Sequence, residues 1–276
     1  MDQDLQDIAN KIIKYLDQKN IQYCDVRADQ QIKNSALIEN NDIEYIKNNE
    51  NKGIGVRLIK NGTWSFCSIT NPNSFDKIKN ILDNTIKNLD YKNIKNKKIK
   101  LHSNPANKRE INFPVLKKTD IEELIKTGLE CNKIISSTPK IIKSITHASH
   151  TTNSKYFVNS EGSEILQNFT DVIMEMVATA HESGQTQSVN ITEGGRGGLE
   201  LITNKIQQSA KEISKKASEL IYAKPVKEEK ATVVMNPDFV SLLTHEILGH
   251  PSEADRVLGK EMAWAGGAWW KGKIGE

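Results

Sequence analysis

Two histidines and a glutamate stand close together late in the chain, as His245, Glu246 and His250. Imidazole nitrogens are common zinc ligands, and a carboxylate beside such a ligand can take a proton from a water that the metal activates. The motif is H-E-x-x-x-H, one residue longer than the H-E-x-x-H of many zinc peptidases. These residues indicate metal-assisted hydrolysis, with His245 and His250 as zinc ligands and Glu246 as general base.

The five-residue spacing requires a local departure from a regular α-helix. Successive residues of an α-helix lie about 100° apart, so two rings five positions apart diverge by roughly 140°. Gly249 loosens the backbone, and Pro251 disfavours α geometry at the residue before it. We therefore predict that the helix unwinds at His250 and that its ring swings back toward His245.

The motif lies on a predicted helix that begins after Asn236, a good N-cap, with Pro237 in the first turn. Residues 231–237 read as a buried strand that leads into this helix. Apolar residues recur at helical spacing along it and predict a buried stripe, made of Phe239, Val240, Leu243 and Ile247. The competing interpretation of the motif is two ordinary histidines at a helix end. With 6 histidines in the chain, such a pattern arises by accident in roughly one of a hundred similar chains.

The sequence around the motif resembles the TldD/PmbA family of metallopeptidases. The segment HEILGHPSEAD (245–255), with the GKE and KGKIGE that follow, is similar to the metal-site segment of that family. The segment GIGVRLIKNGTWSF (53–66) is similar to the signature of its N-terminal domain, and VNSEG (158–162) also fits. TldD-like members carry the histidine-glutamate motif and PmbA-like (TldE-like) partners lack it, so the resemblance places this chain on the TldD-like side.

The resemblance implies a zinc-dependent peptidase that cleaves peptides or unfolded protein segments. It implies a dimer, formed by two like chains or with a PmbA-like subunit. It also implies a third zinc ligand, a cysteine far downstream, which the thiols present do not match: Cys24, Cys67 and Cys131. We therefore expect a chain truncated before the end of its C-terminal domain, with weak zinc binding and little or no activity alone. The alternative is a non-catalytic fragment or a PmbA-like subunit that shapes a peptide channel.

Composition narrows the remaining classes of function. The 38 basic and 35 acidic residues nearly balance, which argues against a nucleic-acid binder, and the basic run at 91–100 reads as a solvated linker. No run approaches the roughly 18 apolar residues of a membrane span. Three scattered cysteines do not make a disulfide framework. The cytoplasm is the expected compartment, and no membrane or nucleic-acid partner is expected.

The elements before the motif predict an α+β fold. Short alternating segments from Tyr23 onward read as antiparallel strands, and Asn61-Gly62 predicts a two-residue type I′ hairpin. Further strands are expected between 141 and 189, a mobile glycine-rich loop at 192–200, and a long helix from a cap at Asn204. The charged segment 224–230 is the expected boundary. It divides an N-terminal α+β domain (1–225), a mostly antiparallel sheet with flanking helices, from the incomplete beginning of a C-terminal metallopeptidase domain (226–276).

Several other residues invite a functional interpretation. Arg57 is expected to be paired or solvated, and three further histidines are expected to serve packing or hydrogen bonding: His147, His150 and His181. Glu253 and Asp255 either orient a ligand imidazole or are exposed acids, and the sequence leaves both open. An exposed aromatic patch is expected from Trp264, Trp269 and Trp270.

Overall fold

The computed structural model of the chain describes residues 3–90, 101–102, 104–202, 205–259, 261–262 and 267–268. The basic run at 91–100, the cap predicted at Asn204 and the three tryptophans lie outside the described residues. The chain divides into two compact units, Met1–Ala223 and Lys224–Glu276. Among the described residues, no helix combines the length and apolar character that crossing a bilayer requires.

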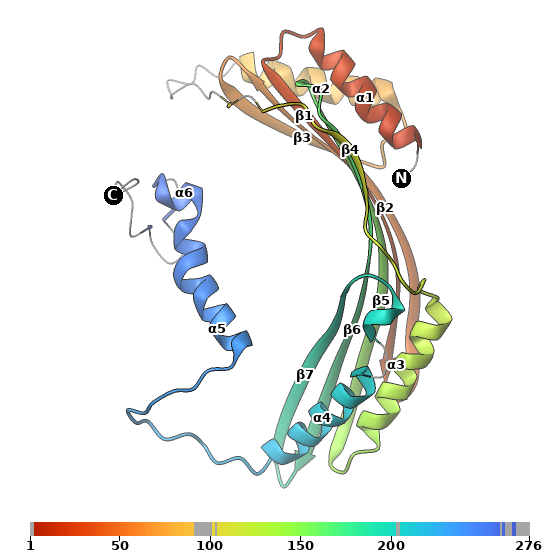
Figure 1. The fold of residues 1–276 in the computed structure, drawn as a ribbon, viewed down its shortest axis with the longest axis vertical. Helices are drawn as coiled ribbons and strands as arrows, with labels where there is room; N and C mark the ends of the chain where they lie inside the picture. The colour runs from red at the N-terminus through yellow and green to blue at the C-terminus, as the bar shows by residue number, and fades with distance from the viewer. Residues whose placement is uncertain are drawn as a thin grey trace. The chain divides into compact units, whose positions relative to one another are not determined.

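The first unit is built on one curled seven-stranded sheet (Figure 1). Its order is β3-β2-β1-β5-β6-β4, and β7 also pairs with β6. Every pairing is antiparallel except that of β4 with β6. With its flanking helices, this sheet confirms the predicted α+β class. The strands are β1 (Tyr23–Glu39), β2 (Asp42–Lys60), β3 (Thr63–Thr70), β4 (Lys108–Asn112), β5 (Ile141–Asn159), β6 (Glu164–Glu182) and β7 (Gln185–Arg196).

Tight turns with left-handed residues connect the first strands. Asn61 (φ 53°) and Gly62 (φ 74°) form the predicted hairpin turn between β2 and β3. A second turn was not foreseen: Asn40 (φ 49°) and Asn41 (φ 73°) join β1 to β2 in the same way. Asparagine tolerates this conformation better than most residues. The short segments predicted from Tyr23 onward are therefore two long, continuous strands.

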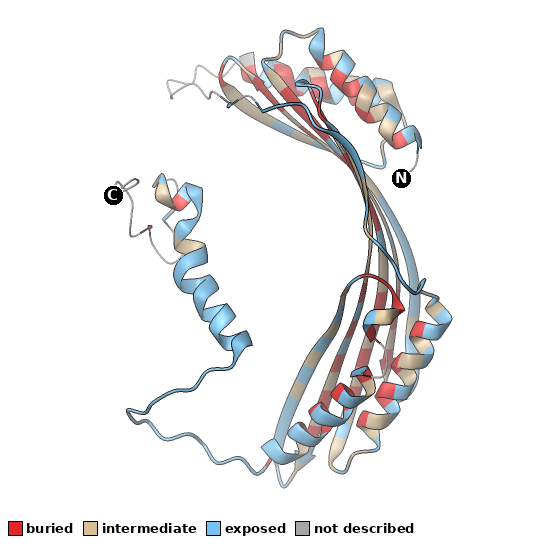
Figure 2. Cartoon of the chain, viewed as in Figure 1, coloured by how far each residue is buried: buried red, intermediate tan, exposed pale blue. Residues whose placement is uncertain are grey.

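Four helices cover one face of the sheet and enclose two cores. α1 (Gln3–Asp17) and α2 (Phe75–Asp90) pack at one end, and α3 (Ile121–Ser136) and α4 (Lys205–Leu220) at the other (Figures 1 and 2). Side chains alternate along a strand, so Val26 of β1 faces the first pair of helices and Ile38, an even number of positions away, faces α3. The second core holds an apolar stripe of β6: Val172, Met174, Met176 and Ala178.

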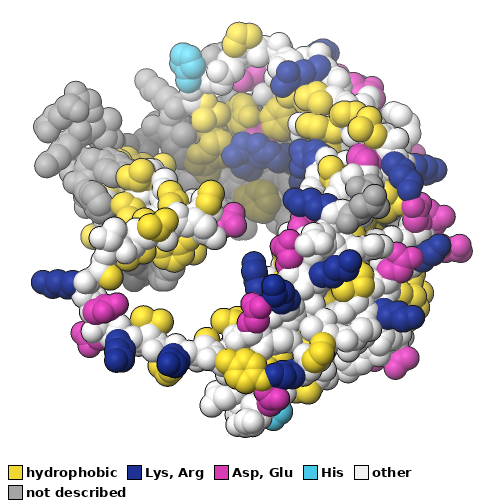
Figure 3. Space-filling view, turned by 60° about the horizontal axis from the view of Figure 1, so that its bottom comes forward, with side chains coloured by type: hydrophobic (Ala, Val, Ile, Leu, Met, Phe, Trp, Pro, Cys, Tyr) yellow, Lys and Arg dark blue, Asp and Glu magenta, His cyan; other side chains and the backbone are white. Residues whose placement is uncertain are grey.

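The opposite face of the sheet carries a buried ion cluster. The Asp25 carboxylate is fully buried, and Arg57 donates to its Oδ2 atom from Nε (2.9 Å) and Nη2 (2.6 Å). Arg27 donates to Oδ1 at 2.8 Å, and the Tyr23 hydroxyl lies 3.2 Å from Oδ2. Arg57 is thus paired, as predicted. On the face seen in Figure 3, charged side chains of both signs are mixed, in keeping with the near-balanced composition.

The glycine-rich segment 192–200 is not the mobile loop that its composition predicts. It completes β7, which pairs with β6 as far as Arg196, and then enters a 3₁₀ turn (Leu199–Ile202). Gly194 has φ +130°, and a Cβ there would lie 2.0 Å from the Val172 carbonyl oxygen. A Cβ at Gly198 would lie 1.9 Å from the Lys117 carbonyl oxygen. Glycine at these positions permits close backbone approach.

Glu200 ties this turn to the segment that precedes α3. Its carboxylate accepts backbone N–H groups from Gly198 (2.8 Å), Lys117 (2.8 Å) and Leu116 (3.3 Å). Burial acts to raise the pKa of Glu200, but these hydrogen bonds outweigh it and lower the pKa from 4.5 to about 2. The ionised carboxylate therefore stabilises the folded state.

This contribution to stability is expected to depend on pH. A carboxyl group whose pKa is lower in the folded chain stabilises fully above about pH 4.5 and loses its effect as the pH falls toward 2. Glu200→Gln should lower the thermal midpoint at pH 7 and flatten its fall between pH 4.5 and 2, as followed by circular dichroism. Glu44→Gln, at an exposed acid of β2, is the control. Equal pH dependence in the wild type and Glu200→Gln would contradict the assignment.

Candidate metal centre

A short helix in the second unit leads to the histidine motif. α5 spans Pro237–Thr244, and the Asn236 side chain caps it by accepting the Phe239 N–H at 2.9 Å, as predicted. The buried strand predicted just before the helix is wrong. Residues 231–236 have no regular secondary structure, and Val234 is 94% exposed. Within the described part of this unit, no strand pairs with them.

The apolar stripe of α5 is exposed, contrary to the prediction. Exposure ranges from 37% at Leu243 to 52% at Phe239, with Val240 and Ile247 between them, and Figure 2 shows the helix as exposed. Spacing predicts which residues share a face, but burial requires a second element to pack on that face. No residue of α5 is buried in this structure.

One turn of π-helix, His245–Gly249, follows α5 directly and carries the motif. The backbone N–H of His250 donates to the carbonyl of His245, five residues back. This pattern places residues five apart one turn above each other. The two rings converge, with their centroids 4.4 Å apart and their planes at 75°. The expected unwinding is wrong, because His250 keeps helical angles (φ −59°, ψ −45°) and the helix widens instead.

Two residues adjoin the π turn. Pro251 has no N–H to donate to a carbonyl four or five residues back, so the i to i−5 hydrogen bonding ends at His250. Gly249 has helical angles (φ −64°, ψ −66°), and a Cβ there would lie 3.5 Å from Nδ1 of His245. A Cβ at this position would therefore be in ordinary van der Waals contact with the His245 ring. π turns are rare overall, but those that occur are often found at functional sites.

The donor atoms of His245, Glu246 and His250 all lie within 4.8 Å of one another. Oε2 of Glu246 is 3.8 Å from Nε2 of His250. Tetrahedral zinc with bonds of about 2.0–2.2 Å holds its donors roughly 3.4 Å apart, so a small closure of the side chains would suffice. Two imidazoles and a carboxylate suit zinc, and no other set of three such ligands lies this close among the described residues.

The remaining histidines and thiols lie elsewhere in the chain. His147 and His150 are on β5, and Nδ1 of His181 is 2.8 Å from the Thr186 hydroxyl. None of them belongs to a cluster of metal ligands among the described residues. Burial raises the pKa of Cys24 and Cys131 to about 12, so both stay protonated and are poor ligands.

The structure separates the two acids that the sequence left equivalent. Glu253 lies next to the motif, with its Oε1 2.8 Å from Nδ1 of His250. Hydrogen bonds from His250 and from Arg256 lower the pKa of Glu253. Asp255 instead accepts the backbone N–H of Arg256 at 2.9 Å. Of these two acids, Glu253 is the one that contacts a histidine of the motif.

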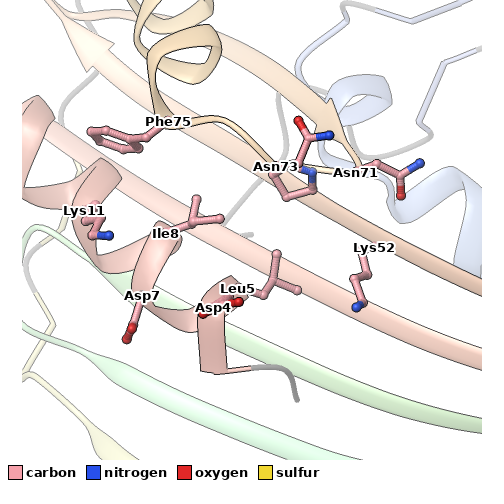
Figure 4. Close-up of a pocket in the computed structure, with 10 residues that line it drawn as sticks. Asp4, Leu5, Asp7, Ile8, Lys11, Lys52, Asn71, Asn73 and Phe75 are labelled. Carbon is pink, nitrogen blue, oxygen red and sulfur yellow. The ribbon is translucent and has the colours of Figure 1, made fainter.

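A cavity of about 550 Å³ lies in the first unit, between α1 and the turn after β3 (Figure 4). Its lining carries both charge signs: Asp4 and Asp7 are acidic, and Lys11 and Lys52 are basic. None of the ten residues that line it is a histidine or a cysteine. The cavity therefore lacks the nitrogen and sulfur ligands of a zinc site.

Two family models match the first unit. The PmbA/TldA metallopeptidase domain 1 matches residues 24–89, and the PmbA/TldA metallopeptidase central domain matches residues 114–223. The chain is 30% identical over 259 residues to metalloprotease MJ0996 of Methanocaldococcus jannaschii, covering 92% of this chain and 55% of that protein. It is 25% identical over 251 residues to the zinc metalloprotease TldD homolog of Saccharolobus solfataricus, covering 90% of this chain and 54% of that protein. The chain spans about half the length of the curated relatives it matches.

Solved structures share the fold. A proposed modulator of DNA gyrase from Bacteroides thetaiotaomicron superposes with a TM-score of 0.77 at 16% identity, over 93% of this chain and 59% of that one. TldE from Thermococcus kodakarensis superposes with a TM-score of 0.60 at 15% identity, over 78% of this chain and 47% of that one. Such low identities show the fold alone. The family models, the curated relatives and the shared fold agree that this chain belongs to the PmbA/TldD metallopeptidase family.

Proposed function

We propose that this chain is a TldD-type, zinc-dependent peptidase component that hydrolyses peptides or unfolded protein segments. One observation carries the proposal: a π turn brings the ring centroids of His245 and His250 within 4.4 Å of each other, beside the carboxylate of Glu246. The naming of the relatives as metalloproteases supports it at the level of the family. Residues 226–276 would then begin the catalytic domain, after an N-terminal α+β domain at 1–225.

Each residue of the motif has a separate role in this proposal. His245 and His250 hold zinc, which when bound supplies a Lewis acid for the scissile carbonyl. Glu246 accepts the proton of the attacking water and returns it to the leaving amine. Oε2 of Glu246 lies 3.8 Å from Nε2 of His250, so the proposed base lies next to a proposed metal ligand. A catalytic zinc site usually has three protein ligands, so we expect weak binding by two histidines.

The proposal extends to partners and compartment. We propose that the chain works in the cytoplasm as a dimer, with a second copy or with a PmbA-like subunit. The likeness of its fold to that of TldE is compatible with either pairing. We also propose that the third zinc ligand lies outside these 276 residues.

The exposure of the motif helix favours a second candidate function. No residue of α5 is buried, and a catalytic site needs its ligands held firmly by surrounding side chains. A subunit that shapes a peptide-binding channel, while another chain performs the chemistry, is compatible with this exposure. The two candidates differ in whether the motif performs hydrolysis.

Metal removal separates these candidates. Cleavage of a quenched fluorescent casein is measured with the metal-free chain, with added Zn²⁺ and after an excess of chelator. We expect weak zinc binding and little or no cleavage by these residues alone, and any cleavage should rise with Zn²⁺ and disappear with the chelator. Cleavage that survives the chelator would overturn metal dependence. Absence of both zinc binding and cleavage would support the channel-forming subunit.

A further inference from the structure

A chain of polar contacts runs from the motif to a buried arginine. Nδ1 of His250 lies 2.8 Å from Oε1 of Glu253, and Oε2 of Glu253 accepts Nε–H of Arg256 at 2.8 Å. Nη2 of Arg256 then lies 3.3 Å from Glu261. Arg256 is only 5% exposed, although it is charged and its unit is mostly exposed. A buried arginine of this kind holds its carboxylate partner in place.

The sequence around Pro251 builds the first of these contacts. Residues His250–Ser252 form a 3₁₀ turn, and the N–H of Glu253 donates to the carbonyl of His250 at 3.2 Å. Side chains three residues apart eclipse on such a turn. The Glu253 carboxylate is therefore placed over the His250 ring by local geometry, and Arg256 sets its direction.

This contact decides which nitrogen of His250 is available to a metal. An ionised carboxylate only accepts hydrogen bonds, so Nδ1 of His250 carries the proton. In the neutral ring, the lone pair then lies on Nε2. That atom faces Glu246 at 3.8 Å, inside the candidate metal centre.

We propose that Glu253 is a positioning residue that fixes the Nδ1–H tautomer of His250 and aims Nε2 at the metal. The metal-binding part rests on the proposed function, whereas the tautomer is a property of the metal-free chain. Carboxylates that hold ligand histidines in this way typically change metal affinity about 10- to 100-fold when removed. In this proposal Glu253 acts through His250, which it contacts at Nδ1.

The first measurement reads the tautomer directly. Nitrogen-15 NMR of the imidazoles, in the metal-free 276-residue chain at pH 8, distinguishes protonated from unprotonated ring nitrogens. We expect unprotonated Nε2 at His250 in the wild type and a mixture of tautomers in Glu253→Ala. Glu253→Gln keeps an acceptor without the charge and should fall between them. An unchanged tautomer in Glu253→Ala overturns the proposal.

The second measurement is Zn²⁺ affinity by competition with a chromophoric chelator. Glu253→Ala should weaken affinity about 10- to 100-fold. The matched control is Asp255→Asn, which removes an acid two residues away whose carboxylate accepts the backbone N–H of Arg256. Equal losses in the two variants would overturn the positioning role. If the wild type binds no zinc while the tautomer shifts as expected, the proposed function fails and only the tautomer-fixing role of Glu253 stands.

Discussion

Replacing Glu246 with glutamine is expected to lower peptide turnover by about 10²- to 10⁴-fold and to change zinc affinity little. Glutamine has nearly the same shape as glutamate but cannot take a proton from the attacking water. The two histidines and the π turn remain intact in this variant. The measurement compares cleavage of an unfolded polypeptide at saturating Zn²⁺ with zinc affinity from a separate titration of the same preparation.

A control variant and the zinc affinity decide the role of Glu246. Glu228→Gln, in the exposed segment before α5, removes the same charge away from the motif and should leave turnover unchanged. A large loss of zinc affinity in Glu246→Gln would identify Glu246 as a third ligand rather than the base. Unchanged turnover in both variants would remove Glu246 from the chemistry altogether.

Loss of either histidine is expected to have the largest effect on the metal. His245→Ala and His250→Ala should each weaken Zn²⁺ binding by at least about 100-fold, since removing a ligand should exceed the 10- to 100-fold effect of its supporting residues. The reason is the π turn, which presents both rings to one space within 4.8 Å of Glu246. Isothermal titration or chelator competition measures the affinity.

The control for these variants is another histidine of the chain. His181→Ala removes an imidazole at the end of β6, where the ring contacts Thr186 and no cluster of ligands. Its zinc affinity should equal that of the wild type. If His181→Ala loses as much affinity as the motif variants, zinc binds elsewhere and the proposed centre is wrong.

The residues of the candidate site could be read from the sequence, but their backbone could not. The spacing of His245 and His250 showed that a regular helix would part the rings, and Gly249 and Pro251 marked where the helix departs from regularity. The sequence did not indicate a π turn, because arguments from periodicity assume one pitch along a helix. Both the unwound and the widened helix satisfy the same spacing, and the five-residue hydrogen bond distinguishes them.

Burial around the site was predicted wrongly for a different reason. Periodicity identified the apolar stripe that includes Phe239 and Leu243, and an apolar run identified residues 231–237 as strand-like. Both patterns show which face of a segment could be buried. Whether it is buried depends on a second element that packs on that face. Within the described residues of this unit no such element covers them.

Local turn signals predicted part of the first unit. Asn61-Gly62 is a strong hairpin signal and was confirmed, whereas Asn40-Asn41 makes the same turn with a weaker one. The glycines near Gly194 were misread because glycine marks both mobile loops and close backbone contacts. A Cβ at Gly194 would lie 2.0 Å from the Val172 oxygen. That contact depends on the tertiary structure and cannot be predicted from composition.

The wide turn at the motif also relates two zinc signatures that are usually treated as distinct. A π turn is an α-helix with one residue inserted, so leaving out Gly249 would turn HEILGH into HEILH, whose four-residue interval suits an ordinary α-helix. The longer and shorter signatures then describe one helical surface at two local pitches. A pattern search that fixes the interval would separate sites that differ by a single codon.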